Sequence, residues 1–376
     1  MTKTITIDPV TRIEGHSKIS IQLDDAGKVT DAHFHVTQMR GFEKFVEGRP
    51  FHEMPSLTAR ICGICPVSHL LASAKACDGL LAVRIPSTAT ELRKIMNLAQ
   101  IAQSHALSFF YLSAPDLLLG MDADPADRNI FRLMRVNPEL VRGGVKLRQT
   151  GQQIIELLGG KRVHPSWIVP GGVSEPLTEE KRDKILAMLP EAIGLAWTAY
   201  EWYAEEVDRF KEEIESFANF PTLFMGLVSP RNTLAMYGGD LRVVASNGAV
   251  LEDRRDPEDY QDIIGEKVEP FSYLKSPYYK PIGYPSGIYR VGPLARMNII
   301  NNPGTRLADA AYEGFKKLDR QSSFHYHYAR LIELLYCLER TEQLLHEPDI
   351  LSKHVRAEAK PNAEEGVGIS EAPRGT

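Results

Sequence analysis

The sequence predicts an α+β fold that is predominantly α-helical, with a bundle of long helices as its core, an N-terminal antiparallel sheet and an inserted region of strands and loops. Apolar and polar residues alternate over residues 3–38 on both sides of the turn-forming stretch DDAGK, a pattern typical of short antiparallel strands. Four later stretches repeat apolar residues at helical spacing. Between them, residues 219–300 are rich in Gly, Pro and Tyr, which favours strands and loops.

The predicted helices are long enough to pack against one another as a bundle. The first has an apolar face and Ser87 or Thr88 as its expected cap. The third contains Pro190, where a kink is expected because proline removes a backbone hydrogen bond. In chain order, the predicted helices cover residues 87–112, 138–160, 177–218 and 325–347.

The composition describes a globular chain and excludes several classes of function. A length of 376 residues with 43% hydrophobic residues allows a large core, and no linker or repeat divides residues 1–376, so we expect a single domain. The net charge is −5, from 44 basic and 49 acidic residues that are interspersed, so neither nucleic acid nor an anionic membrane is an expected partner. The sequence shows no signal peptide and no apolar run of about 18 residues, so we expect a cytoplasmic protein without a membrane span.

Two of the four cysteines stand three residues apart in the stretch RICGICPVSH, with a histidine four residues further on. Cys62 and Cys65 precede a predicted helix, whose N-terminus favours thiolates. A structural zinc site would need about two more ligands, and no second CxxC provides them. A thioredoxin-like dithiol lacks its strand-then-helix setting, and Pro66 excludes haem attachment. From this motif alone, Cys62 and Cys65 could be either metal ligands or two buried core residues.

Five segments, taken together, are more specific than the cysteine pair. They are DPVTRIEGH (residues 8–16), RGFEKFVEGR (40–49), RICGICPVSH (60–69), SAPD (113–116) and EAPRG (371–375). In this order they resemble the large, catalytic subunit of nickel-iron hydrogenases, and the similarity is greatest to the soluble bidirectional NAD-linked type. The resemblance extends over residues 5–376.

The resemblance implies a nickel-iron centre whose iron carries carbonyl and cyanide ligands. Cys62 would be a terminal ligand of nickel, and Cys65 would bridge nickel and iron, since soft thiolates suit both metals. His69 would lie one helical turn after Cys65 and donate a hydrogen bond to its sulfur. Taken alone, His69 could equally be a core histidine.

The resemblance also assigns two carboxylates. Glu14 matches the residue that relays protons between the metals and the surface. Glu43 matches a ligand of a structural magnesium or iron ion, which prefers carboxylate oxygen. For Glu43, a salt bridge with Arg40 or Lys44 is an open alternative.

The last matching segments contribute three further residues. Arg374 matches a guanidinium above the open side of the metals. Asp116 would hold that guanidinium through a charge-assisted pair, and Pro373 would line the pocket of the iron diatomics.

Five other histidines and cysteines are expected to be ordinary core residues. His105 lies near the apolar face of its helix, although it could contact the site. His325 and His327 do not share a helix face and make a poor metal pair. Cys77 and Cys337 fall within apolar helical runs and act most simply as small core side chains.

The implied activity is reversible heterolytic cleavage of H2. Electrons would pass to a small subunit with an iron-sulfur cluster, and from there to diaphorase subunits with flavin and NAD; the chain itself contains no G-x-G-x-x-G. Maturation factors would insert the metals. The family's second CxxC pair, expected near the C-terminus, is absent from residues 1–376.

That absence keeps other interpretations open. The sequence could be an inactive fragment of a hydrogenase, a non-catalytic scaffold or a zinc-thiol protein derived from the family. It could also be a relative of the quinone-site subunit of respiratory complex I, which carries no nickel, although retention of both Cys62 and Cys65 argues against this.

Overall fold

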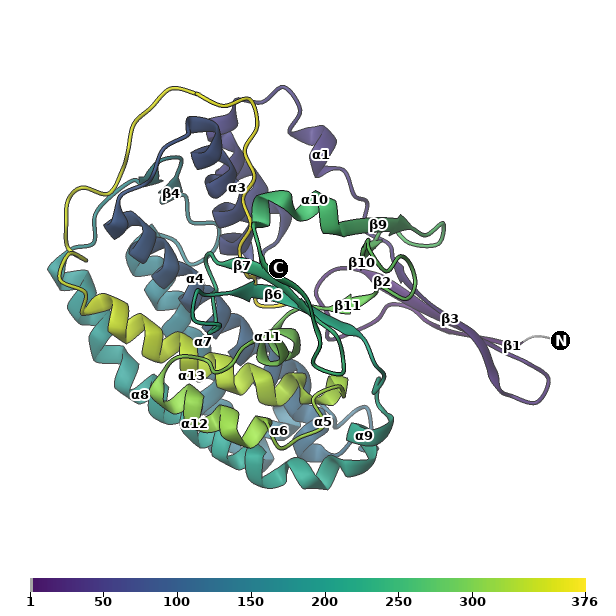
Figure 1. Ribbon diagram of the computed structural model, residues 1–376. Helices are drawn as coiled ribbons and strands as arrows, with labels where there is room; N and C mark the ends of the chain where they lie inside the picture. The colour runs from purple at the N-terminus through teal and green to yellow at the C-terminus, as the bar shows by residue number, and fades with distance from the viewer. Residues whose placement is uncertain (1–2) are drawn as a thin grey trace. The chain divides into compact units, whose positions relative to one another are not determined.

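The computed structural model of the protein describes residues 3–376 (Figure 1), and the chain divides into two compact units. Unit 1 comprises Met1–Glu47 and Tyr260–Tyr289, and unit 2 comprises Gly48–Asp259 and Arg290–Thr376. Long helices and several small sheets make up the chain. The predicted α+β, predominantly helical fold class is therefore confirmed.

Unit 1 contains the predicted N-terminal sheet. Its strands β1 (Lys3–Ile7), β2 (Ser17–Leu23) and β3 (Val29–Val36) pair antiparallel in the order β1-β2-β3. A second hairpin, β9 (Ile264–Val268) and β10 (Lys275–Tyr279), belongs to the same unit, with the short helices α1 (Phe42–Phe45) and α10 (Tyr260–Ile263). The loop of this hairpin contacts β3, because the Tyr273 amide donates to the Val36 carbonyl at 3.1 Å and the His33 ring stacks on Phe271.

Unit 2 is built on the helices that the sequence predicts. The bundle consists of four long helices that contact one another, as Figure 1 shows: α4 (Ser87–Leu107), α7 (Pro138–Gly159), α8 (Glu179–Glu206) and α13 (Tyr326–Leu345). Helix α8 continues through Pro190. The remaining helices of unit 2 are α2 (Met54–Thr58), α3 (Pro66–Leu81), α5 (Ala114–Leu119), α6 (Ile130–Val136), α9 (Lys211–Ser216), α11 (Pro293–Ile299) and α12 (Arg306–Phe315).

Glycines let the helices of the bundle approach closely. A Cβ added to Gly151 of α7 would lie 2.7 Å from both the Ala99 carbonyl oxygen and the Gln103 Cβ of α4. A Cβ on Gly144 would overlap the ring of Phe110, which belongs to a π-helical turn, Ser108–Ser113, that directly follows α4. The contact between α4 and α7 therefore fixes the position of α4.

The predicted inserted strands are also present. The strands β6 (Leu223–Val228), β7 (Asp240–Val244) and β8 (Val250–Arg255) form an antiparallel sheet, with β11 (Tyr289–Arg290) beside β6. Every residue of β6 is buried, and α11 packs against this strand. A two-stranded sheet of β4 (Ile168–Val169) and β5 (Gly172–Val173) completes the β-structure of unit 2.

The predicted cap of α4 was wrong. Pro86 is the N-cap residue, Ser87 is already helical, and neither Ser87 nor Thr88 caps the helix in the described chain. The Thr88 hydroxyl donates instead to the carbonyl of Asp349 at 3.0 Å. The Thr88 hydroxyl thus bonds to Asp349, which is distant in sequence, whereas the local pattern predicted that it would cap the start of α4.

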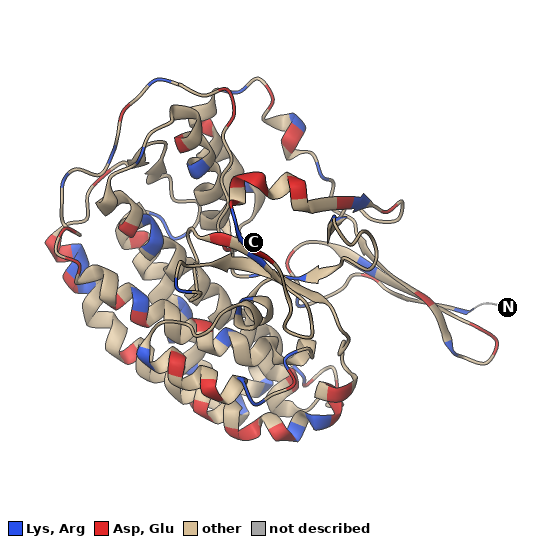
Figure 2. Ribbon diagram, in the orientation of Figure 1, with Lys and Arg blue, Asp and Glu red and all other residues tan. Residues whose placement is uncertain are grey.

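The charges of the chain are mixed over its surface. Figure 2 shows basic and acidic residues interspersed along the helices, in agreement with the mixed pattern of the sequence. No helix within residues 3–376 has the length and apolar character that a bilayer span requires.

A buried ion network joins α11, α13 and the last residues of unit 2. Arg296, Glu333 and Glu371 are fully buried, and the Arg296 guanidinium pairs with Glu333 and with Glu371 at 2.6 Å each. Burial raises the pKa of Glu333, but the charge and hydrogen bonds of Arg296 outweigh it, and the pKa falls to about 2. His105 of α4, whose pKa burial lowers to about 4, bonds to Glu333 at 2.7 Å. A neutral imidazole beside an ionised carboxylate is the hydrogen-bond donor.

We expect Arg296→Met to lower the free energy of unfolding by about 3–5 kcal/mol, because it leaves two buried carboxylates without their cation. Chemical denaturation measured by circular dichroism checks this. The control is Arg209→Met, which removes an exposed pair with Glu206 and should cost at most about 1 kcal/mol. Equal losses for the two variants would contradict a stabilising role for the network.

Candidate metal centre

Cys62, Cys65 and His69 come together where α3 begins. Cys65 is the N-cap residue of α3, Pro66 is the first helical residue, and His69 follows one turn later. The His69 Nε2 atom lies 3.8 Å from the Cys65 sulfur. The ligand atoms of all three residues lie within 4.8 Å of one another, and they form the one such histidine, cysteine or carboxylate group among residues 3–376.

The turn between the cysteines directs backbone amides at the sulfur of Cys62. The amides of Ile64 and Cys65 donate to this sulfur at 3.4 and 3.2 Å. A hydrogen bond from Cys65 lowers the pKa of Cys62 well below that of an ordinary thiol; burial opposes this shift, whereas His69 and the two amides strengthen it. Cys62 is therefore prepared as a thiolate, the form that binds metals.

The other two cysteines behave as predicted. Cys77 and Cys337 are buried free thiols. Burial raises the pKa of Cys77 to about 11 and that of Cys337 well above the ordinary value. His325 and His327 do not belong to the ligand group found in the described chain.

The donor set fits a soft or borderline metal. Two cysteine sulfurs and an imidazole suit nickel, zinc or copper, whereas magnesium would require oxygen ligands. These three side chains alone do not distinguish nickel from zinc, because both metals accept sulfur and nitrogen ligands.

The EAPRG segment is held from both sides. Asn97 of α4 donates to the Glu371 carbonyl at 3.1 Å, and Arg296 donates to the carbonyls of Ala372 at 3.0 Å and Pro373 at 3.4 Å. Pro373 is buried, whereas Arg374 is exposed.

Ser104 is a partner of Arg374 that the sequence analysis missed. The Arg374 guanidinium donates to the Ser104 hydroxyl at 3.2 Å. Asp116, which was expected to hold this guanidinium, forms an ion pair with Arg128 at 3.3 Å; its pairing with Arg374 stays a prediction. A signal for Ser104 was available, because polar residues interrupt the predicted apolar helix at positions 97, 100, 103 and 104.

Glu14 and Glu43 belong to unit 1, and both are exposed. Arg40 donates a short hydrogen bond to Glu43, which is the salt bridge that the sequence left as an alternative. A backbone hydrogen bond is the largest cause that lowers the pKa of Glu43, and the hydrogen bond from Arg40 is the second. A single carboxylate paired with an arginine does not constitute a magnesium site, so the assignment of Glu43 as a metal ligand stays a prediction.

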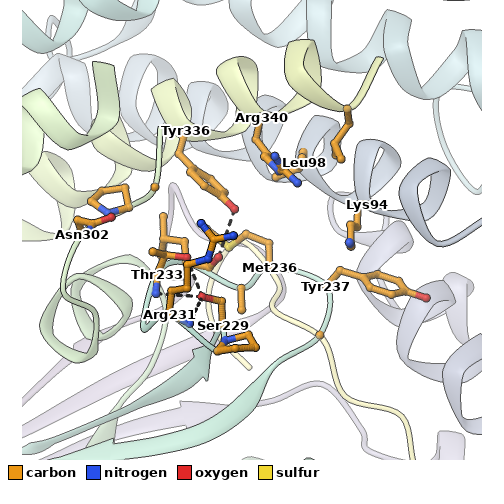
Figure 3. A pocket seen from close by; sticks show the side chains of 17 residues that line it. Lys94, Leu98, Ser229, Arg231, Thr233, Met236, Tyr237, Asn302, Tyr336 and Arg340 are labelled. Atoms are coloured by element: carbon orange, nitrogen blue, oxygen red, sulfur yellow. Dashed lines mark hydrogen bonds between the residues drawn. The ribbon is translucent and has the colours of Figure 1, made fainter. Parts of the chain in front are cut away.

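A cavity of about 750 Å³ lies next to the loop that contains Met236, a residue that also bonds to the EAPRG segment. Figure 3 shows that it is bounded by α4, α13 and the loop after β6, with the Tyr336 hydroxyl bonded to the Leu234 carbonyl at 3.3 Å. Met236 lines this cavity, and its carbonyl accepts hydrogen bonds from Asn97 and from the Glu371 amide. Cys62, Cys65 and His69 do not line it.

Comparison with known proteins adds independent evidence. A family profile described as HoxL-like matches residues 4–39, and one described as Nickel-dependent hydrogenase matches residues 40–133. The vhu F420-non-reducing hydrogenase of Methanococcus voltae has a chain that is 44% identical over 99% of this chain and 89% of its own length. The NAD-reducing hydrogenase HoxS subunit beta of Cupriavidus necator is 41% identical over 100% of this chain and 80% of its own length.

Solved structures show the same fold. An NAD+-reducing [NiFe]-hydrogenase in the H2-reduced state superposes with a TM-score of 0.96 at 44% identity, over 100% of this chain and 84% of that chain. The Ni-Fe-Se hydrogenase of D. vulgaris Hildenborough gives a TM-score of 0.79 at 26% identity, over 100% of this chain and 85% of that chain. These similarities confirm the resemblance that the five segments indicate. The chain belongs to the family of nickel-dependent hydrogenase large subunits, and the protein is an oxidoreductase.

Proposed function

We propose that this hydrogenase chain cleaves H2 reversibly and heterolytically and that its electrons reduce NAD. The observation that carries the NAD assignment is the similarity to an NAD+-reducing hydrogenase, with a TM-score of 0.96 over the whole chain. In this proposal the chain works with a small subunit that carries an iron-sulfur cluster and with diaphorase subunits that bind flavin and NAD. The proposal places the protein in the cytoplasm, where NAD circulates, and requires maturation factors to insert the metals.

The donor set found in unit 2 supports a nickel-iron centre. Cys62 would bind nickel as a terminal ligand, and Cys65 would bridge nickel to an iron that carries carbonyl and cyanide ligands. When bound, this centre supplies the Lewis acidity that polarises H2. His69, at 3.8 Å from the Cys65 sulfur, would orient that sulfur through a hydrogen bond.

The chain's own residues would move and stabilise charge around the centre. We assign Glu14 to carry protons between the cysteine sulfurs and the surface, because a carboxylate can exchange protons near neutral pH. The Arg374 guanidinium would place positive charge above the metals, with Asp116 and Ser104 as its partners. Pro373 would line the pocket of the iron diatomics, and Glu43 would bind a structural magnesium or iron ion together with ligands not yet identified.

A second candidate differs in the electron acceptor. The relative from Methanococcus voltae is named as an F420-non-reducing hydrogenase and is as similar to this chain, at 44% identity, as the NAD+-reducing structure is. A chain of this kind could pass electrons to an acceptor other than NAD.

The acceptor can be tested directly on the complex purified from its native source. Under H2, we expect it to reduce NAD+ as well as a viologen dye, because the diaphorase subunits would complete the electron path. Absorbance at the NADH band and at the viologen band measures both. Reduction of the dye alone would refute the NAD assignment and leave the hydrogenase assignment intact.

Replacing either cysteine of the pair should empty the metal centre. We expect Cys65→Ser to lose most of the bound nickel, because serine lacks the soft sulfur ligand. Elemental analysis of the purified complex measures nickel, iron and zinc together. Cys77→Ser is the control and should keep the wild-type nickel content, since Cys77 is a buried thiol outside the ligand group. Wild-type protein with stoichiometric zinc and no nickel would support the zinc-thiol alternative.

Glu14→Gln should slow hydrogen–deuterium exchange between H2 and D2O by about 10²- to 10⁴-fold, the usual contribution of a positioned acid-base group. Nickel content should be unchanged, because Glu14 is not a proposed ligand. Mass spectrometry of the gas phase measures the exchange. Glu47→Gln, an exposed unit 1 carboxylate paired with Lys44, is the matched control. A wild-type exchange rate in Glu14→Gln would rule out the proton role.

A further inference from the structure

Two glutamines of α4 converge on one carbonyl of the cysteine loop. The Gln100 Nε2 atom donates to the Ile64 carbonyl oxygen at 2.7 Å, and the Gln103 Nε2 atom donates to the same oxygen at 3.1 Å. Both side chains are almost completely buried, with exposed fractions of 1% and 5%. A half-buried loop carbonyl that receives two side-chain amides is therefore held in one orientation.

The orientation of this carbonyl determines where a neighbouring amide points. The Ile64 carbonyl and the Cys65 N–H belong to the same peptide unit, which is planar and trans, so the two groups point in opposite directions. The Cys65 amide donates to the Cys62 sulfur at 3.2 Å. When the glutamines fix the oxygen on one side of the peptide, they direct the amide at the sulfur on the other side.

The same contacts strengthen the amide as a donor. A carbonyl that accepts hydrogen bonds polarises its peptide, and chains of hydrogen bonds reinforce one another in a low-dielectric interior. The glutamines thus act on the Cys62 sulfur without touching it.

Helix α4 provides a rigid base for the two glutamines. Gln100 and Gln103 are three residues apart and share a face of the helix. Gly151 of α7 packs so closely that an added Cβ would lie 2.7 Å from the Gln103 Cβ. The packing of the bundle therefore restricts Gln103 directly, and it restricts Gln100 through the helix that carries both residues.

We propose that Gln100 and Gln103 are positioning residues of the metal centre, which act through the Ile64–Cys65 peptide to hold the Cys62 sulfur in its metal-binding geometry. That the metal is nickel rests on the proposed function. That the glutamines order the loop rests on the contacts of unit 2 alone.

Two measurements on the full chain test the proposal in Gln100→Leu, Gln103→Leu and the double variant. Amide hydrogen exchange at Cys65 should become faster, because its hydrogen bond to sulfur loses its support. The affinity for added Ni²⁺, used as the probe, should fall by about 10- to 100-fold in the double variant, as is usual when the groups that orient a metal ligand are removed. Gln100→Leu should have the larger single effect, since it removes the shorter hydrogen bond.

Asn298→Leu is the matched control. This side-chain amide donates to the carbonyls of Leu294 and Arg320 in the same unit, so its loss removes a comparable number of hydrogen bonds away from the cysteine loop. It should leave both the Cys65 exchange rate and the Ni²⁺ affinity as in the wild type. If the double variant does not fold, Gln103→Leu, which keeps the 2.7 Å bond, provides the same comparison.

Wild-type exchange at Cys65 together with wild-type Ni²⁺ affinity in the glutamine variants would overturn the proposal. So would equal changes in Asn298→Leu, because the effect would then be general destabilisation. Neither outcome depends on H2 turnover. A complex that fails to consume H2 would refute the proposed function and leave the exchange result standing.

Discussion

The Arg296 guanidinium donates five hydrogen bonds, two to Glu333 of α13 and three to residues 371–373. A cation with no exposed surface would be expensive to bury by itself, and Glu333 and Glu371 offset this cost. The two carboxylates leave the group with one excess negative charge, and the half-buried Arg330, which acts electrostatically on Glu333, balances it. Because the partners come from segments that are distant in sequence, the observed path of the EAPRG segment depends on the packing of α11 against α13.

Helix α4 joins this network to the cysteine loop through a polar stripe in a buried helix. The residues of this stripe bond to different parts of the site. Asn97 bonds to the Glu371 carbonyl, Gln100 and Gln103 bond to the Ile64 carbonyl, Ser104 bonds to Arg374, and His105 bonds to Glu333. One helix therefore sets the position of both the CxxC loop and the arginine segment. The π-helical turn that follows α4 is a feature that often occurs near functional sites, where it re-aims side chains.

The sequence alone was sufficient to predict the elements that depend on residues close together in the chain. Periodicity predicted the N-terminal sheet and the four long helices, and the spacing of Cys65 and His69 predicted that they would lie one helical turn apart at a helix start. Contacts made across the fold could not be predicted in this way. Thr88 bonds to Asp349 instead of capping α4, and Ser104 meets a guanidinium 270 residues away. The polar stripe was visible in the sequence, but only the packing of the bundle shows what each residue contacts.

The four cysteines show why placement, and not composition, decides where a metal can bind. Cys62 accepts two amide hydrogen bonds and one from Cys65, which stabilise its anion and lower its pKa. Cys77 and Cys337 are surrounded by the apolar core, and burial raises the pKa of both thiols. At neutral pH the first environment presents a thiolate, whereas the other two keep the proton. A soft metal ion that reaches the chain therefore meets one reactive thiolate with a second thiol and an imidazole beside it, and the remaining cysteines do not compete for it.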